Sequence, residues 1–157
     1  LLGEAGKTGK PVLLKRGLSA QFNEWLFAAE YVMKQGNMNV ILCERGIRTF
    51  ETHTRNTLPL SSVPAVRKHS HLPVAVDPSH GTGQADYVRS MSRAAAAAGA
   101  DLLLIEATDD PGKALTDGAQ TVNFPQLKDI MDDLRGIADL FGMEIPAPGE
   151  KGTGNRK

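Results

Sequence analysis

The chain has 157 residues, enough for one domain with a substantial core but fewer than the roughly 250 of a complete eight-stranded α/β barrel. Lys plus Arg and Asp plus Glu number 18 each, so the balanced charge gives no support to a nucleic-acid or membrane partner. One cysteine, Cys43, excludes an intramolecular disulfide and fits a reducing compartment. No apolar run approaches the roughly 20 residues of a membrane span and no signal-peptide pattern opens the chain, so we expect a cytoplasmic protein.

Four short apolar runs end in charged residues, and each is predicted to be a buried parallel strand. The runs cover residues 12–16, 40–45, 74–80 and 102–106. Their starts lie roughly 30 residues apart, the length of a βα unit, so consecutive βα units are favoured over hairpins. The carboxyl ends of parallel strands commonly carry the active site of α/β enzymes.

The segments between these runs show helical periodicity. Residues 1–9 resemble a fragment of helix and a loop, and apolar residues recur with helical spacing over 22–33. A short helix is predicted near Ser62, with Pro64 in its first turn, and an alanine-rich helix over 85–98. The last helix is predicted to begin after a cap at Asn123 and to continue to Phe141. The residues that follow, 143–157, predict a disordered tail.

Four βα units amount to half of a closed α/β barrel. Alone, they would expose the inner face of the sheet and leave two open strand edges, both of which favour unwanted association. We therefore expect that the chain pairs with a second half, flattens into an open sheet, or is a piece of something longer.

Cations end the first two runs. Lys15 and Arg16 precede a glycine, and Glu44 and Arg45 precede another, an arrangement that suits a phosphate approaching the backbone. A solvated loop explains either pair alone, but two successive strand ends with the same device favour an anion site. The following loop carries two more arginines that fit either an anion or a structural partner, Glu44 or Glu51: Arg48 and Arg55.

A histidine and carboxylates end the last two runs. His80 follows Asp77 and Pro78 on a predicted loop, Glu106 ends the fourth run, and Asp117 lies in the next loop. One imidazole and two carboxylates from neighbouring strand ends suit a divalent first-row metal. The remaining candidates are read as structural: Cys43 as a small buried residue, and as surface residues His53, His69 and His71.

Several strings resemble the 3-deoxy-D-arabino-heptulosonate 7-phosphate synthase family, also called 3-deoxy-7-phosphoheptulonate synthase or phospho-2-dehydro-3-deoxyheptonate aldolase. The resemblance is to the branch related to 3-deoxy-manno-octulosonate 8-phosphate synthase, and it runs from about residue 10 to residue 141. The most specific string is Cys-Glu-Arg-Gly, which begins at Cys43. The others lie within residues 10–17, 24–31, 47–58, 71–80 and 114–118.

The resemblance implies a (β/α)8 TIM barrel, in which residues 1–142 would form the second half as four consecutive βα units. It also implies an enzyme of the shikimate pathway to aromatic amino acids. The expected reaction condenses phosphoenolpyruvate with erythrose 4-phosphate to give 3-deoxy-D-arabino-heptulosonate 7-phosphate and phosphate.

The resemblance further implies a divalent metal of the Mn, Fe, Zn or Co class. By motif, His80, Glu106 and Asp117 match three of the family's four metal ligands. The fourth, a cysteine on the first strand of the barrel, has no counterpart here, because Cys43 is not that residue.

The substrate side follows in the same way. Lys15 and Arg45 match the lysine and arginine that hold phosphoenolpyruvate, so Lys15, Arg45 and His80 are the expected catalytic residues. Two carboxylates beside them, Glu44 and Asp77, complete the expected substrate-binding set.

Three readings of the function remain open. The family's Lys-Pro-Arg and Gly-Ala-Arg segments are absent, which favours a non-catalytic or incomplete half that needs an amino-terminal half. The retained site residues favour the synthase, acting as a homo-oligomer or paired with such a half. The third reading changes the second substrate to arabinose 5-phosphate, as in the octulosonate synthase.

Overall fold

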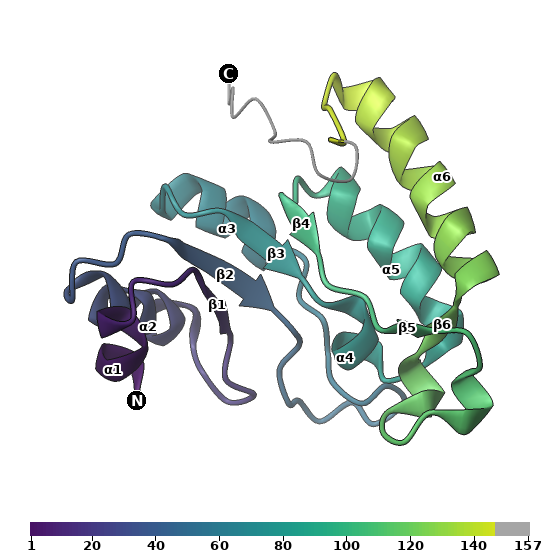
Figure 1. The fold of residues 1–157 in the computed structure, drawn as a ribbon, viewed down its shortest axis with the longest axis horizontal. Helices are drawn as coiled ribbons and strands as arrows, with labels where there is room; N and C mark the ends of the chain where they lie inside the picture. The colour runs from purple at the N-terminus through teal and green to yellow at the C-terminus, as the bar shows by residue number, and fades with distance from the viewer. Residues whose placement is uncertain (147–157) are drawn as a thin grey trace.

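The computed structural model describes residues 1–146, and a four-stranded parallel sheet forms their centre (Figure 1). The strands lie in chain order: β1 (Val12–Lys15), β2 (Val40–Glu44), β3 (Val74–Val76) and β4 (Leu102–Leu103). All four predicted starts are confirmed, and so is the α/β class with βα units of a partial barrel. Because the pairs β1–β2, β2–β3 and β3–β4 are parallel, the four carboxyl ends point to one edge.

The predicted helices are present. They are α1 (Leu2–Lys7), α2 (Phe22–Met33), α3 (Ser62–His69), α5 (Ala85–Ala97) and α6 (Phe124–Phe141). The last of these begins at a capping box in which Asn123 and Gln126 each accept a backbone N–H of the other. The predicted tail lies, from residue 147 on, outside the described residues.

The region beyond β3 differs from the prediction in two ways. His80 lies on a short helix, α4 (Pro78–Thr82), and not on a loop, because Asp77 caps the helix and Pro78 suits its first turn. The fourth strand ends at Leu103, short of Glu106, because the Glu106 amide donates to the Ser79 hydroxyl on α4. Four short elements follow that the sequence did not suggest: β5 (Ala107–Thr108), η1 (Pro111–Lys113), η2 (Gly118–Gln120) and β6 (Val122–Asn123), with β5 and β6 paired in parallel.

The two faces of the sheet have different surroundings. Leu14, Leu42 and Val74 point to the helices and pack in a core with Trp25 and Val63. Their neighbours along each strand point to the opposite face, because side chains alternate along a strand. This opposite face corresponds to the interior of a closed barrel, and we call it the inner face.

The inner face is partly open. Leu13 on β1 and Leu102 on β4 are 40% and 43% exposed, and these two strands are the edges of the sheet. A second small core joins α5 to α6 through Val88, Ile130 and Leu134. Between these helices and β4 lies an apolar groove of about 430 Å³. Among the described residues, no helix is long and apolar enough to cross a membrane.

Candidate metal and substrate site

The turn after β3 places Asp77 and His80 side by side. One Asp77 carboxylate oxygen accepts the His80 backbone N–H at 2.9 Å, which caps α4. The same carboxylate faces the imidazole Nδ1, at 2.8 Å from Oδ2. Asp77 is fully buried, so both its contacts and the ring orientation of His80 are fixed by the fold. A carboxylate on one ring nitrogen is the usual support of a metal-binding histidine.

The other nitrogen of His80 points at Glu106. The distance from Nε2 to Oε1 is 3.0 Å, and the second Glu106 oxygen accepts a hydrogen bond from Gln120. When Nδ1 carries the proton toward Asp77, the lone pair of Nε2 faces a carboxylate oxygen directly. A cation between the two atoms would turn this repulsion into ligation.

Asp117 completes the group. It lies on the connection to η2 in a left-handed conformation, with a φ of 57°, and its carboxylate accepts a hydrogen bond from Arg55. One potential ligand atom from each of His80, Glu106 and Asp117 lies within 4.8 Å of the others. The sequence leaves Glu44 and Glu51 open as partners of Arg55. In the structure Arg55 pairs with Asp117 instead.

This donor set fits a divalent cation. One imidazole and two carboxylates form a mixed nitrogen and oxygen set, which first-row divalent metals accept. His80 is largely buried, whereas Glu106 and Asp117 are about one-third exposed. Two carboxylates beside one imidazole leave excess negative charge, for which Arg55 supplies only part of the balance.

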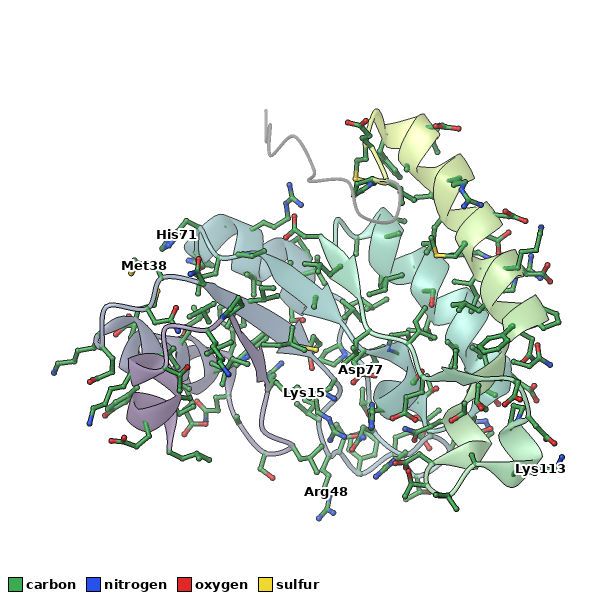
Figure 2. The ribbon with its side chains drawn as sticks, in the orientation of Figure 1. Lys15, Met38, Arg48, His71, Asp77 and Lys113 are labelled. Atoms are coloured by element: carbon green, nitrogen blue, oxygen red, sulfur yellow. The ribbon has the colours of Figure 1, made fainter. Side chains whose placement is uncertain are left out.

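The phosphate-binding candidate Lys15 is linked to this group. Its ammonium lies 2.9 Å from the Asp77 carboxylate while its side chain remains 38% exposed. Figure 2 shows Lys15 and Asp77 together at the carboxyl end of the sheet, whereas Met38 and His71 lie at the opposite end. The Asp77 carboxylate thus contacts both Lys15 and His80.

Register separates the two cations that follow one another on β1. Lys15 is aligned with Cys43 and Cys43 with Ala75, so the three share the inner face. Arg16 lies behind the sheet, where its guanidinium contacts the Glu44 carboxylate at 2.8 Å. The sequence predicts both Lys15 and Arg16 as anion ligands, but only Lys15 lies on the face of the sheet that carries the candidate site.

Glu44 is fully buried on this rear side. Besides Arg16, its carboxylate accepts the backbone N–H of Gly46 at 3.0 Å, which fixes the turn carrying Arg45. Both oxygens therefore have partners within the chain, and substrate binding by Glu44 stays a prediction. The turn needs glycine, since Gly46 has a φ of +88° and a Cβ would come within 2.7 Å of Asn56.

Cys43 is buried, as the sequence predicts. Burial, and then the charge of Asp77, raise the pKa of its thiol to about 12. The other three histidines, His53, His69 and His71, are exposed as expected.

Two polar residues at the site are not among the site residues predicted from the sequence. Gln120 is 2% exposed and bonds both Glu106 and Arg55. Asn56 is buried and donates to the His80 carbonyl at 2.9 Å, which ties the long loop after β2 to α4. Neither glutamine nor asparagine ranks as a ligand by type, and only the fold shows that their amides face the candidate ligands.

Comparison with known proteins identifies the family. A sequence profile described as the DAHP synthetase I family matches residues 1–139. The chain belongs to this family. It is 50% identical over 145 residues to the phospho-2-dehydro-3-deoxyheptonate aldolase of Thermotoga maritima, covering 92% of this chain and 43% of that protein. It is 31% identical to the 2-dehydro-3-deoxyphosphooctonate aldolase of Koribacter versatilis, over 88% of this chain and 54% of that protein.

Solved structures agree with the sequence comparison. The crystal structure of the Thermotoga maritima aldolase, also described as DAHP synthase, superposes with a TM-score of 0.92 at 49% identity. The match covers 93% of this chain and 43% of that one. A truncated form of the same synthase matches with the same TM-score, and this chain covers 56% of it. The chain therefore spans about half the length of the relatives it matches, with the expected half-barrel fold.

Proposed function

We propose that this chain supplies the carboxyl-terminal half of a metal-dependent synthase. The proposed reaction joins C3 of phosphoenolpyruvate to the aldehyde carbon of erythrose 4-phosphate. Water adds at C2, and inorganic phosphate leaves, so the product is 3-deoxy-D-arabino-heptulosonate 7-phosphate. In a cell the reaction would take place in the cytoplasm. It would be the first step toward the aromatic amino acids.

One observation carries the proposal: a candidate metal-ligand trio and a phosphate-binding candidate share Asp77 at one edge of the sheet. His80 contacts this carboxylate on one side, and Lys15 on the other. The 50% identity to a heptonate aldolase supports the assignment of the reaction class.

The cations would bind the phosphoenolpyruvate anion. Lys15 is 38% exposed, and Arg45 is partly exposed and its side chain forms no hydrogen bond or ion pair within residues 1–146, so a ligand can reach both. Holding the anion between two cations aligns its methylene carbon with the aldehyde, which is chiefly a positioning effect. The backbone beside Arg45 is held by the bond from the Gly46 N–H to the Glu44 carboxylate.

His80, Glu106 and Asp117 would hold the metal, through the Nε2 atom and the two carboxylates. A bound divalent metal supplies Lewis-acid polarisation of the aldehyde oxygen or activation of the attacking water. In the tautomer whose Nδ1–H donates to Asp77, Nε2 would present its lone pair to the metal.

The partner in this proposal is an amino-terminal half-barrel or another copy of the chain. The open inner face and the exposed Leu13 and Leu102 at the two sheet edges support such pairing. The corresponding alternative is a half-barrel that binds its partner half and does not catalyse the reaction by itself.

An octulosonate-type reaction with arabinose 5-phosphate is the second candidate. Relatives of that type are about one-third identical, against 50% for the heptonate aldolase. Erythrose 4-phosphate is therefore the favoured second substrate.

The test combines this chain with the separately produced amino-terminal half of the Thermotoga maritima relative. Phosphate released from phosphoenolpyruvate is measured with erythrose 4-phosphate, with arabinose 5-phosphate and with neither. We expect the mixture to release phosphate only with erythrose 4-phosphate. Lys15→Ala and His80→Ala should each lower the rate at least about 100-fold, the usual loss for a contact that stabilises developing charge.

Matched substitutions at exposed positions serve as controls. Lys68→Ala on α3 and His71→Ala at the far end of the sheet should leave the rate unchanged. Full turnover by the Lys15→Ala or His80→Ala variant would contradict the proposed reaction at this site. Phosphate release with arabinose 5-phosphate but not with erythrose 4-phosphate would favour the octulosonate reaction instead.

A further inference from the structure

Gln120 is a buried neutral residue between two charged ones. Its amide nitrogen donates to the Glu106 carboxylate at 2.9 Å, and its amide oxygen accepts from the Arg55 guanidinium at 2.8 Å. Both neighbours dictate the same orientation of the amide, since a carboxylate only accepts and a guanidinium only donates. The glutamine cannot flip without losing both bonds.

Arg55 extends this arrangement to the next carboxylate. The guanidinium nitrogen that donates to Gln120 also donates to Asp117 at 3.1 Å. A continuous chain of hydrogen bonds therefore runs Glu106–Gln120–Arg55–Asp117, and we call it the amide–guanidinium relay. Its two ends are carboxylates of the candidate metal-ligand trio.

The fold holds Arg55 in this position. Its backbone N–H donates to the Thr82 carbonyl at 3.0 Å. The next residue after Thr82 is Gly83, with a φ of +71°, and a Cβ there would lie 2.6 Å from the Cβ of Arg55. Arg55 can therefore lie this close to the backbone only because residue 83 is a glycine.

We infer that Gln120 is a positioning residue for the metal site, and that the amide–guanidinium relay sets the separation of Glu106 and Asp117. The inference deepens the metal site of the proposed function and rests on it. One Glu106 oxygen is bonded to the relay and the other lies 3.0 Å from His80 Nε2, while Arg55 holds one oxygen of Asp117, whose carboxylate supplies the third potential ligand atom. Mutation of a residue that hydrogen-bonds a metal ligand in this way typically lowers the metal affinity by about 10- to 100-fold.

The test measures Co²⁺ binding by the full chain, through the visible absorption of the bound ion, and needs no turnover. Gln120→Met keeps the side-chain length and the neutral charge but removes both hydrogen bonds. We expect it to weaken Co²⁺ binding by about 10- to 100-fold and to alter the absorption bands. Because no charge changes, an altered affinity reports geometry and not electrostatic attraction.

Two further variants separate positioning from folding. Gln126→Met makes the same chemical change in the capping box of α6, so it should lower the melting temperature and leave Co²⁺ affinity unchanged. Arg55→Lys keeps the positive charge but loses the guanidinium geometry, and it should weaken binding even if Gln120→Met does not fold.

The outcomes are distinct. Affinities of Gln120→Met and Arg55→Lys within twofold of the parent would overturn the positioning role while leaving the metal site intact. Failure of the parent chain to bind Co²⁺ would overturn both the trio and the relay. Loss of phosphate release with normal Co²⁺ binding would count against the proposed reaction and not against the relay.

Discussion

The ion pair behind the sheet is the most deeply buried charge interaction among the described residues. Arg16 and Glu44 lie 2.8 Å apart with side-chain exposures of 9% and 0%, and the guanidinium stacks 5.8 Å above the Trp25 ring. The arginine also donates to the Ala20 carbonyl. The pair links the ends of β1 and β2 directly behind Lys15 and Arg45.

Removal of one partner should be costly. Arg16→Met leaves the Glu44 carboxylate buried without its counter-ion, and we expect a loss of about 3–5 kcal/mol in the free energy of unfolding. The double variant Arg16→Met with Glu44→Gln should recover part of that loss, because no uncompensated charge remains. Urea unfolding of the three variants measures this, and equal stabilities of the parent and Arg16→Met would contradict it.

Cys43 should resist thiol reagents in the native chain. It is fully buried, and its pKa of about 12 keeps the thiol protonated at ordinary pH, whereas only the thiolate attacks such reagents efficiently. We expect no labelling by iodoacetamide at pH 8 and complete labelling in denaturant, as counted by mass spectrometry. Rapid native labelling would show that the inner face around Cys43 is accessible.

At this scale the sequence identifies residues by their type and spacing, but not by their partners. His80, Glu106 and Asp117 were predictable as potential ligands because they follow strand ends. Whether a cation faces the site depends on strand register, which separates Lys15 from Arg16, and the register is known only from the fold. Gln120 was missed because a buried neutral amide has no distinctive pattern in a single sequence.

Among the helices, α6 carries the strongest local signals. Asn123 accepts the backbone N–H of Gln126 at 2.8 Å, and the Gln126 side chain returns the bond to the Asn123 backbone. Asn123→Ala should lower the free energy of unfolding by about 1 kcal/mol, since the cap bond is lost. Thermal unfolding measures the change, and Co²⁺ binding at the site of His80, Glu106 and Asp117 should not change.

Helices α5 and α6 are joined by a charge network that should respond to pH. Hydrogen bonds from Arg89, and then from Arg93, hold the pKa of Asp133 below its usual value of 3.8. A carboxyl with a lowered folded pKa stabilises the fold above its unfolded pKa, and this contribution disappears as pH falls through the lowered value.

Asp133→Asn should therefore lower the melting temperature at neutral pH. The difference from the parent should stay constant down to about pH 5 and shrink toward zero as the medium becomes strongly acidic. Melting curves across that range, with added salt as a second variable, test this. A difference that grows as the pH falls would contradict the sign of the effect.

Elements were predictable where local signals agree. The four strand starts follow from the apolar runs and the start of α6 follows from Asn123, and both appear as expected. The short helix α4 was missed because five residues give no period, although Asp77 and Pro78 form a good helix start. The end of β4 was misplaced because the Ser79 contact that draws Glu106 away is a tertiary interaction.

For the whole molecule, the decisive feature is an incomplete surface. The sheet has two open edges, an inner face with exposed leucines and a candidate site at its rim. Half of the barrel was predictable from the number of βα units, whereas what covers the inner face is a proposal. The site chemistry and the pairing of the half-barrel are thus two aspects of one account.

The central claim is that His80, Glu106 and Asp117 bind one metal ion beside Lys15. Anomalous diffraction from crystals of the chain grown with Zn²⁺ tests it most directly. We predict one strong peak at about 2.0–2.2 Å from His80 Nε2 and from a carboxylate oxygen of each acidic residue. A peak at the exposed His69 or His71 instead, with no density at this trio, would contradict the account.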